Sequence, residues 1–180
     1  MKDEEQSLIK KAQAGNSAAF GRLYDRYLPS IYRFVFIRVG RKQDAEDISQ
    51  QVFTSAWQNI DGFEFKGYPF SSWIYRIASN AVIDYYRTAK NNVSIDNVPE
   101  EFFSEETNDE ANVDRAINMT TVRVALTRLE PDQQNVLIMK FVEDLSNKEI
   151  AEALGKSEGA VRVIQHRALK QLKTHLDGTH

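Results

Sequence analysis

Apolar residues recur at helical spacing along most of the chain, and the clearest pattern lies near its C-terminus. Ile150, Ala151 and Leu154 share one face of a short predicted helix. Gly155 fits the left-handed residue that ends such a helix, and Ser157 fits the N-cap of the next one. The pattern therefore predicts two helices joined by a tight turn.

The second of these helices is predicted to have an apolar stripe and a cationic flank. The stripe consists of Val161, Ile164, Ala168, Leu169 and Leu172, and the flank of Arg162, His166, Lys170 and Lys173. In a helix-turn-helix the second helix lies in the DNA major groove, with its early side chains at base edges and its later cations at phosphates. Arg162, Val163 and His166 are therefore the candidate base contacts, and the apolar Val163 suits a thymine methyl group. The alternative is a helical hairpin with an ordinary solvated basic face.

The first ninety residues also follow the helical period. We expect helical structure from Asn16 to Trp57. Pro29 predicts a break or kink because proline lacks a backbone N–H, and Gly40 predicts a stop. Asp44 is predicted to cap the helix that follows.

That helix is predicted to have one apolar band and one polar face. The band consists of Ala45, Ile48, Val52, Ala56 and Ile60, and the opposite face of Asp47, Gln50, Gln51, Thr54 and Gln58. A polar face with few cations suits another protein better than phosphates, although an ordinary solvated face is equally open.

The next segment interleaves aromatic rings with cations. Its rings are Phe63, Phe65, Tyr68, Phe70, Trp73, Tyr75, Tyr85 and Tyr86, and its cations Lys66, Arg76, Arg87 and Lys90. Such a mixture is typical of sites for single-stranded nucleic acid, where rings stack on bases and cations follow the backbone. Most rings on the helix, Trp73 included, are expected to be core. The loop aromatics and an outward stripe of Arg76, Asn80 and Arg87 are the better functional candidates.

Charge is distributed unevenly along the chain. The net charge is -3, yet residues 91–119 alone carry -7, from eight acids against Arg115. Residues 155–180 carry +3. Residues 91–119 also lack a helical period, which predicts an acidic linker, partly disordered, between two mildly basic ends.

Several kinds of protein are excluded or disfavoured by composition. Cysteine is absent, which rules out disulfides and thiolate metal sites and fits a reducing cytoplasm. No metal-ligand spacing, nucleotide-binding loop or nucleophile elbow occurs, so we expect neither a cofactor nor a catalytic site. The N-terminal fifteen residues are too acidic for a signal peptide, and no apolar run approaches the ~20 residues of a membrane span.

After the linker the helical period returns. Val122, Leu126 and Leu129 predict one helix, and Pro131 predicts the start of another. With the helix-turn-helix these make a four-helix unit. The expected fold class is all-α, with a helical domain at 1–90, a linker at 91–119 and a second helical domain at 120–180.

The combination of motifs resembles a bacterial sigma factor of the extracytoplasmic-function branch. The helix DAEDISQQVFTSAW is followed by the aromatic helix WIYRIASNAVIDYYR and then by the helix-turn-helix, over a span from Ala18 to Lys173. The resemblance implies a non-catalytic specificity subunit of RNA polymerase. It assigns sigma region 2 to the first domain and sigma region 4 to the second.

The resemblance also implies site residues. Contacts to the clamp helices of the polymerase β′ subunit would come from Asp44, Asp47, Gln50, Gln51 and Phe53. The -10 element would be captured as a melted strand by Phe65, Arg76, Asn80 and Arg87, where Arg76 and Asn80 belong to the family's R-I-A-x-N run. The -35 element would be read as duplex by Lys156, Ser157, Arg162, Val163, His166, Arg167 and Lys170. Family members usually carry an acid at Gln51 and often Ser-Arg at Val163 and Ile164, so core affinity and promoter sequence can differ here.

Implied partners are core RNA polymerase, through its β′ clamp helices and β flap, promoter DNA, and an anti-sigma factor. The anti-sigma factor would clamp between the domains over the Asp47 and Arg162 faces, hold the protein until a stress or other signal arrives, and could tether it to the membrane. Two other classes remain open. An ordinary helix-turn-helix regulator would bind a two-fold operator tightly without polymerase, and an enzyme would turn over a substrate.

Overall fold

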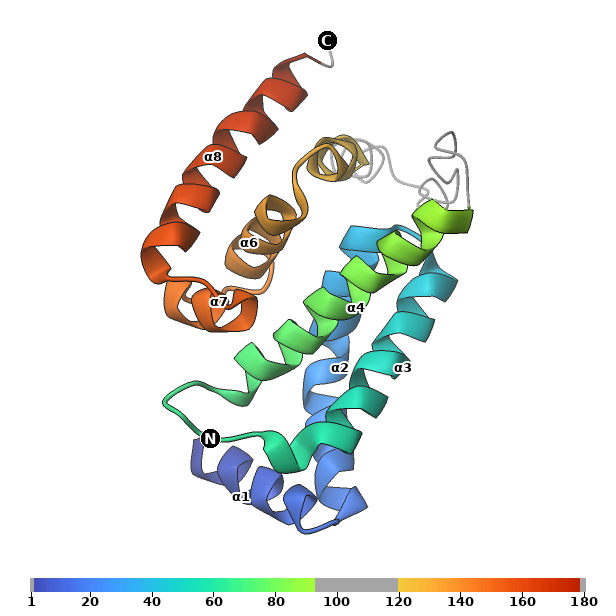
Figure 1. Cartoon of the computed structure of the whole chain (residues 1–180), viewed down its shortest axis with the longest axis vertical. Coiled ribbons are helices and arrows are strands. Elements are labelled where there is room, and N and C mark those ends of the chain that lie inside the picture. The colour runs from blue at the N-terminus through green and yellow to red at the C-terminus, as the bar shows by residue number, and fades with distance from the viewer. Residues whose placement is uncertain (1, 93–119, 179–180) are drawn as a thin grey trace, which may run out of the picture.

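The computed structural model describes residues 2–92 and 120–178. These residues are almost entirely helical and include no strand, so the predicted all-α class is confirmed (Figure 1). The predicted linker lies largely outside the described ranges. Across the described helices, none combines the length and apolar character needed to cross a membrane.

The first domain consists of four helices and a short 3-10 turn. They are α1 (Lys2–Gln13), α2 (Ser17–Val39), α3 (Lys42–Asn59), η1 (Ile60–Gly62) and α4 (Phe70–Asn92). The long helix α2 packs against α1, α3 and α4. Asn16 begins α2 by accepting a hydrogen bond from the Ala19 N–H at 2.9 Å, and Gly40 ends it at a left-handed φ of 76°.

The break predicted as one alternative at Pro29 is wrong, because Pro29 lies inside α2, which continues to Val39. A second local prediction is also wrong. Asp44 is not a helix cap, because α3 begins at Lys42 with Arg41 in the N-cap position. Asp44 lies instead in the first turn, where its negative charge interacts favourably with the positive end of the helix dipole.

The second domain contains a helical segment at 120–127, then α6 (Pro131–Phe141), α7 (Asn147–Leu154) and α8 (Glu158–Asp177). The predicted turn is confirmed: Gly155 has a φ of 63°, and Ser157 Oγ accepts from the Ala160 N–H at 3.1 Å. The sequence missed one detail of α8. Leu169, assigned to the apolar stripe, is 41% exposed.

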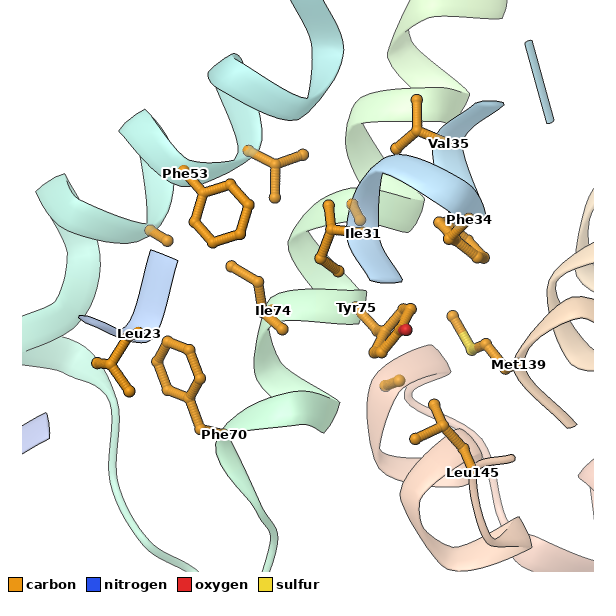
Figure 2. Packing of buried hydrophobic residues seen from close by; sticks show 14 of the residues in the cluster. Leu23, Ile31, Phe34, Val35, Phe53, Phe70, Ile74, Tyr75, Met139 and Leu145 are labelled. Atoms are coloured by element: carbon orange, nitrogen blue, oxygen red, sulfur yellow. The ribbon is translucent and has the colours of Figure 1, made fainter. Parts of the chain in front are cut away.

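The two domains pack directly against each other and share one hydrophobic cluster. Helix α4 contacts α7, and α2 contacts α6. Met139 and Leu145 of the second domain point toward Tyr75 of the first, whose ring meets Phe34 edge-on at 5.5 Å (Figure 2). Because Met139 and Phe34 are fully buried, this contact excludes water from the domain boundary. The protein is therefore in a closed arrangement.

Candidate nucleic-acid and polymerase interfaces

The cationic side of α8 faces outward. Helix α8 lies on the far side of α6 and α7 from the first domain, so the domain contact leaves it uncovered (Figure 1). Its exposed predicted contacts are Arg162, Val163, His166, Arg167 and Lys170. Val163 is 48% exposed although it is apolar. Contact with a thymine methyl group would remove this apolar side chain from water.

Two cations at the start of α8 form ion pairs with neighbouring acids. Lys156 Nζ lies 2.8 Å from Asp132 Oδ2 on α6, and Arg162 Nη2 lies 3.5 Å from Glu158 Oε2. Both cations are thereby held near the turn. A phosphate or base would compete with these carboxylates for them, and exposed ion pairs of this kind are weak enough to exchange.

The polar face of α3 is exposed as predicted. Asp47, Gln50, Gln51, Thr54 and Gln58 all lie at the surface, and the predicted apolar band is buried beneath them. Phe53 does not belong to this face. It is only 4% exposed and packs edge-on against Tyr24 at a ring separation of 4.7 Å, so its predicted contact with the polymerase is not available at the surface.

A groove of about 680 Å³ runs between α3 and α4. It is lined by Asp44, Asp47 and Gln51 from one helix and by Asn80 from the other. The sequence had assigned these residues to separate sites, and the structure brings them together. Asp44 Oδ2 accepts a hydrogen bond from the Tyr85 O–H at 2.7 Å. Burial, and after it this bond, raises the pKa of Tyr85 to about 12. Because Asp44 and Asp47 both line it, the groove is acidic on the α3 side.

The four residues predicted for the melted strand are not equivalent. Asn80 is exposed, and Phe65 is 38% exposed in the loop before α4, with its ring against Phe63 at 4.9 Å. Arg87 pairs within α4, with Nη2 3.0 Å from Asp84 Oδ1. Arg76 is engaged by the second domain: its Nη2 donates to the backbone carbonyl of Glu152 on α7 and lies 3.0 Å from Glu152 Oε1.

Other polar residues connect the domains. Glu143, which follows α6, accepts from Arg33 Nε at 2.7 Å and from the Tyr75 O–H at 3.0 Å. Its side chain is 2% exposed. Lys148 of α7 lies over the ring of Tyr68 in the loop before α4, at 5.5 Å. The loop and helix assigned to the -10 element thus both contact the helix-turn-helix.

A buried arginine takes part in the contact between the two domains. Arg38 is 2% exposed, and its Nη1 donates to Oδ1 of Asn135 on α6. Asn135 is fully buried and donates to Ser79 Oγ at 2.8 Å. Burial lowers the pKa of the Arg38 guanidinium to about 10, so it stays charged at neutral pH. In the described part of the chain Arg38 Nε has no hydrogen-bond partner, so the closed arrangement holds a charge that is only partly compensated.

Comparison with known proteins agrees with these surfaces. Residues 23–92 match the family described as Sigma-70 region 2, and residues 120–172 match Sigma-70, region 4. The relatives of this chain include extracytoplasmic-function (ECF) RNA polymerase sigma factors at 30% identity or more. The chain belongs to the ECF sigma factors. Members of this family are specificity subunits for transcription initiation.

Among ECF relatives, sigma factor BldN of Streptomyces coelicolor is 35% identical over 166 residues. The match covers 92% of this chain and 63% of BldN, so the chain spans less than two thirds of that relative. Sigma factor SigD of Mycobacterium tuberculosis is 30% identical over 176 residues, covering 94% of this chain and 82% of SigD. Among solved structures, CnrH in complex with the cytosolic domain of CnrY is 25% identical, with a TM-score of 0.74 over 98% of this chain and 99% of that one.

Sequence patterns missed the residues that close this ECF sigma factor. Asn135 is a polar residue within a largely apolar helix, and Glu143 is an acid in a turn. Neither pattern specifies a partner more than fifty residues away. A signal for Arg38 was present, because it is the one charge in the otherwise apolar run FVFIRVG. A charge in such a run is a candidate for burial with a polar partner.

Proposed function

We propose that the chain binds core RNA polymerase and directs transcription from promoters that it reads at two elements. Region 4 would read the -35 element as duplex through the exposed face of α8, and region 2 would hold the melted -10 strand. The observation that carries the proposal is the pairing, in one chain, of an outward cationic recognition helix with a separate surface of polar residues and exposed aromatics. Neither task requires a catalytic group.

The closed arrangement must open for both elements to be bound. The -10 and -35 elements are centred roughly 25 base pairs apart, which is about 85 Å along B-DNA at ~3.4 Å per base pair. A compact chain of 180 residues is only about 40 Å across. Residues 93–119 could span about 90 Å when fully extended, so the chain between the domains is long enough. Opening would also release Arg76 from Glu152.

An experiment on the whole activity uses core polymerase free of sigma and a pool of promoter fragments from the host. We expect transcripts from a limited set of fragments, permanganate-reactive thymines at one shared position, and protection of a duplex element upstream. Transcription without a shared upstream element would contradict the two-element proposal.

Replacing Arg162 by alanine is expected to weaken reading of the -35 element. Loss of a base contact typically costs about 1–3 kcal/mol and relaxes specificity at one position. The matched control is Lys173→Ala, which removes an exposed cation from a later turn of the same helix and is expected to weaken binding evenly across sequences. Binding of sigma-loaded polymerase to a set of single-base -35 variants measures both. An even loss for Arg162→Ala would show that it does not read a base.

Reversing the charge of Asp47 is expected to weaken core binding about tenfold or more. Asp47 lies on the exposed polar face of α3, and a reversed charge at a complementary interface adds repulsion to the lost attraction. The control is Glu46→Lys, the same reversal at the neighbouring exposed residue, which points to another side of the helix. Titration of labelled core polymerase gives both affinities. Equal losses of affinity in the two variants would indicate a general charge effect and contradict a specific contact at Asp47.

An anti-sigma partner is also part of the proposal. CnrH, which has a similar fold, is solved with the cytosolic domain of CnrY, and this supports a protein partner for the chain. Because α4 and α7 already pack together, a partner that preserves this arrangement would bind the outer faces that carry Asp47 and Arg162. Such a partner would block polymerase and promoter at once and would release the protein in response to a signal.

A further inference from the structure

The first helix of the chain lies outside the residues matched by the region 2 family, which begin at residue 23. Helix α1 is nevertheless firmly held. Ile9 is fully buried, Glu4 Oε1 lies 2.8 Å from Arg22 Nη2, and Glu5 Oε2 accepts from the Tyr27 O–H at 2.7 Å. A helix fixed in this way can position whatever its last turn contacts.

The last turn of α1 contacts the beginning of the loop before α4. Gln13 Nε2 donates to two backbone carbonyls, Ile60 O at 3.0 Å and Phe63 O at 2.8 Å. These carbonyls bracket the 3-10 turn η1, and Ile60 O also accepts from the Phe63 N–H at 3.0 Å. One side chain therefore holds both ends of the turn from which the loop departs.

Phe63 connects this turn to the exposed aromatic residue. Its ring is 6% exposed and lies edge-on to Phe70 and at 5.3 Å from Trp73, so the ring is fixed in the core. The next ring in the loop is Phe65, which meets Phe63 edge-on at 4.9 Å. Fixing the Phe63 backbone therefore fixes the direction in which the Phe65 ring is presented.

We propose that Gln13 is a positioning residue that holds the loop at 63–69 so that Phe65 is presented to an unpaired base. This inference rests on the proposed capture of a melted strand by region 2. Gln13 would act without touching DNA. Its two hydrogen bonds would lower the cost of ordering the loop when the base stacks.

The test replaces Gln13 by methionine, which keeps the length of the side chain and removes both donors. The control is Gln6→Met, the same change at an exposed position of the same helix. The first readout is hydrogen exchange of the 61–68 amides in the free chain. The second is promoter opening, measured by permanganate reactivity at the -10 element with sigma-loaded polymerase.

For Gln13→Met we expect faster exchange in this segment and promoter opening lowered about five- to 150-fold, the effect of losing two neutral hydrogen bonds. Affinity for core polymerase and protection of the -35 duplex should be unchanged, and a merely structural defect would not spare both. Gln6→Met should match the wild type in every measurement.

Unchanged exchange, or faster exchange with normal promoter opening, would overturn the inference. Failure of the proposed function looks different, because the wild-type chain itself would then open no promoter. In that case hydrogen exchange alone still decides whether Gln13 holds the loop.

Discussion

Replacing Asn135 by leucine is expected to open the closed arrangement. Leucine fills a similar volume but accepts no hydrogen bond. The Arg38 guanidinium would therefore stay charged and buried, and it would lose the one hydrogen-bond acceptor that it has among the described residues. Leaving a buried charged donor unpaired costs about 2–3 kcal/mol. This cost shifts the balance between closed and open forms roughly 30- to 140-fold toward the open form.

The absence of cysteine makes this shift straightforward to measure. Single cysteines at the exposed positions Asp25 and Gln171 place one dye on each domain, and energy transfer between them reports closure. The control is Asn59→Leu, the same substitution at an exposed position of α3. We expect low transfer for Asn135→Leu and high transfer for the control. High transfer in both would mean that the Arg38–Asn135 contact does not hold the domains together.

Alanine substitutions of the two partners in the Arg76–Glu152 ion pair are expected to have opposite effects on promoter opening. Glu152→Ala removes the ion pair and leaves only the bond from Arg76 to the backbone carbonyl at position 152. Closure is then slightly weakened, by up to about 1 kcal/mol because both side chains are partly exposed. Promoter opening should therefore rise, by up to about fivefold. Arg76→Ala weakens closure as well, but it also removes a cation proposed to contact the melted strand. Loss of such a charge-assisted contact costs about 1.5–3 kcal/mol, so opening should fall roughly 10- to 100-fold.

Energy transfer and promoter opening measured on the same two variants separate the roles of Arg76. Both variants should show lower transfer, which reports the lost interdomain pair. If Arg76 served only to close the molecule, Arg76→Ala would raise promoter opening as Glu152→Ala does. A rise for both variants would remove Arg76 from the -10 site and leave Phe65, Asn80 and Arg87 as its candidates.

Local chemistry determined what could be predicted from the sequence. The turn between α7 and α8 was predictable because a left-handed glycine and a serine N-cap each act within four residues of themselves. The polar face of α3 followed from the helical period alone. Asp44 was misread because an acid in the first turn and an N-cap acid give the same sequence signal.

Contacts between the domains could not be predicted, because they depend on pairs far apart in sequence. The bond between Arg38 and Asn135 joins residues on α2 and α6, and its formation depends on how whole helices pack. Phe53 illustrates the same limit from the other direction. The family motif placed it at the polymerase contact, whereas packing against Tyr24 removes it from the surface.

The closed arrangement combines a well-packed apolar contact with polar contacts of modest strength. Met139 and Leu145 supply apolar burial against Tyr75, while Arg38 carries a desolvation cost that opening would relieve. Balance between these terms gives an interface that can separate when DNA and polymerase offer better partners. Regions 2 and 4 would then bind their promoter elements from the two ends of an extended molecule.

The most direct test of the central claim is gel filtration of the full chain with core RNA polymerase that lacks sigma. The sigma factor account predicts co-elution at one chain per polymerase, and weak binding of the free chain to promoter duplex, because few phosphates are neutralised by its mildly basic second domain. Failure to co-elute, together with tight and salt-sensitive binding to duplex DNA by the chain alone, would contradict the account and indicate an ordinary helix-turn-helix regulator.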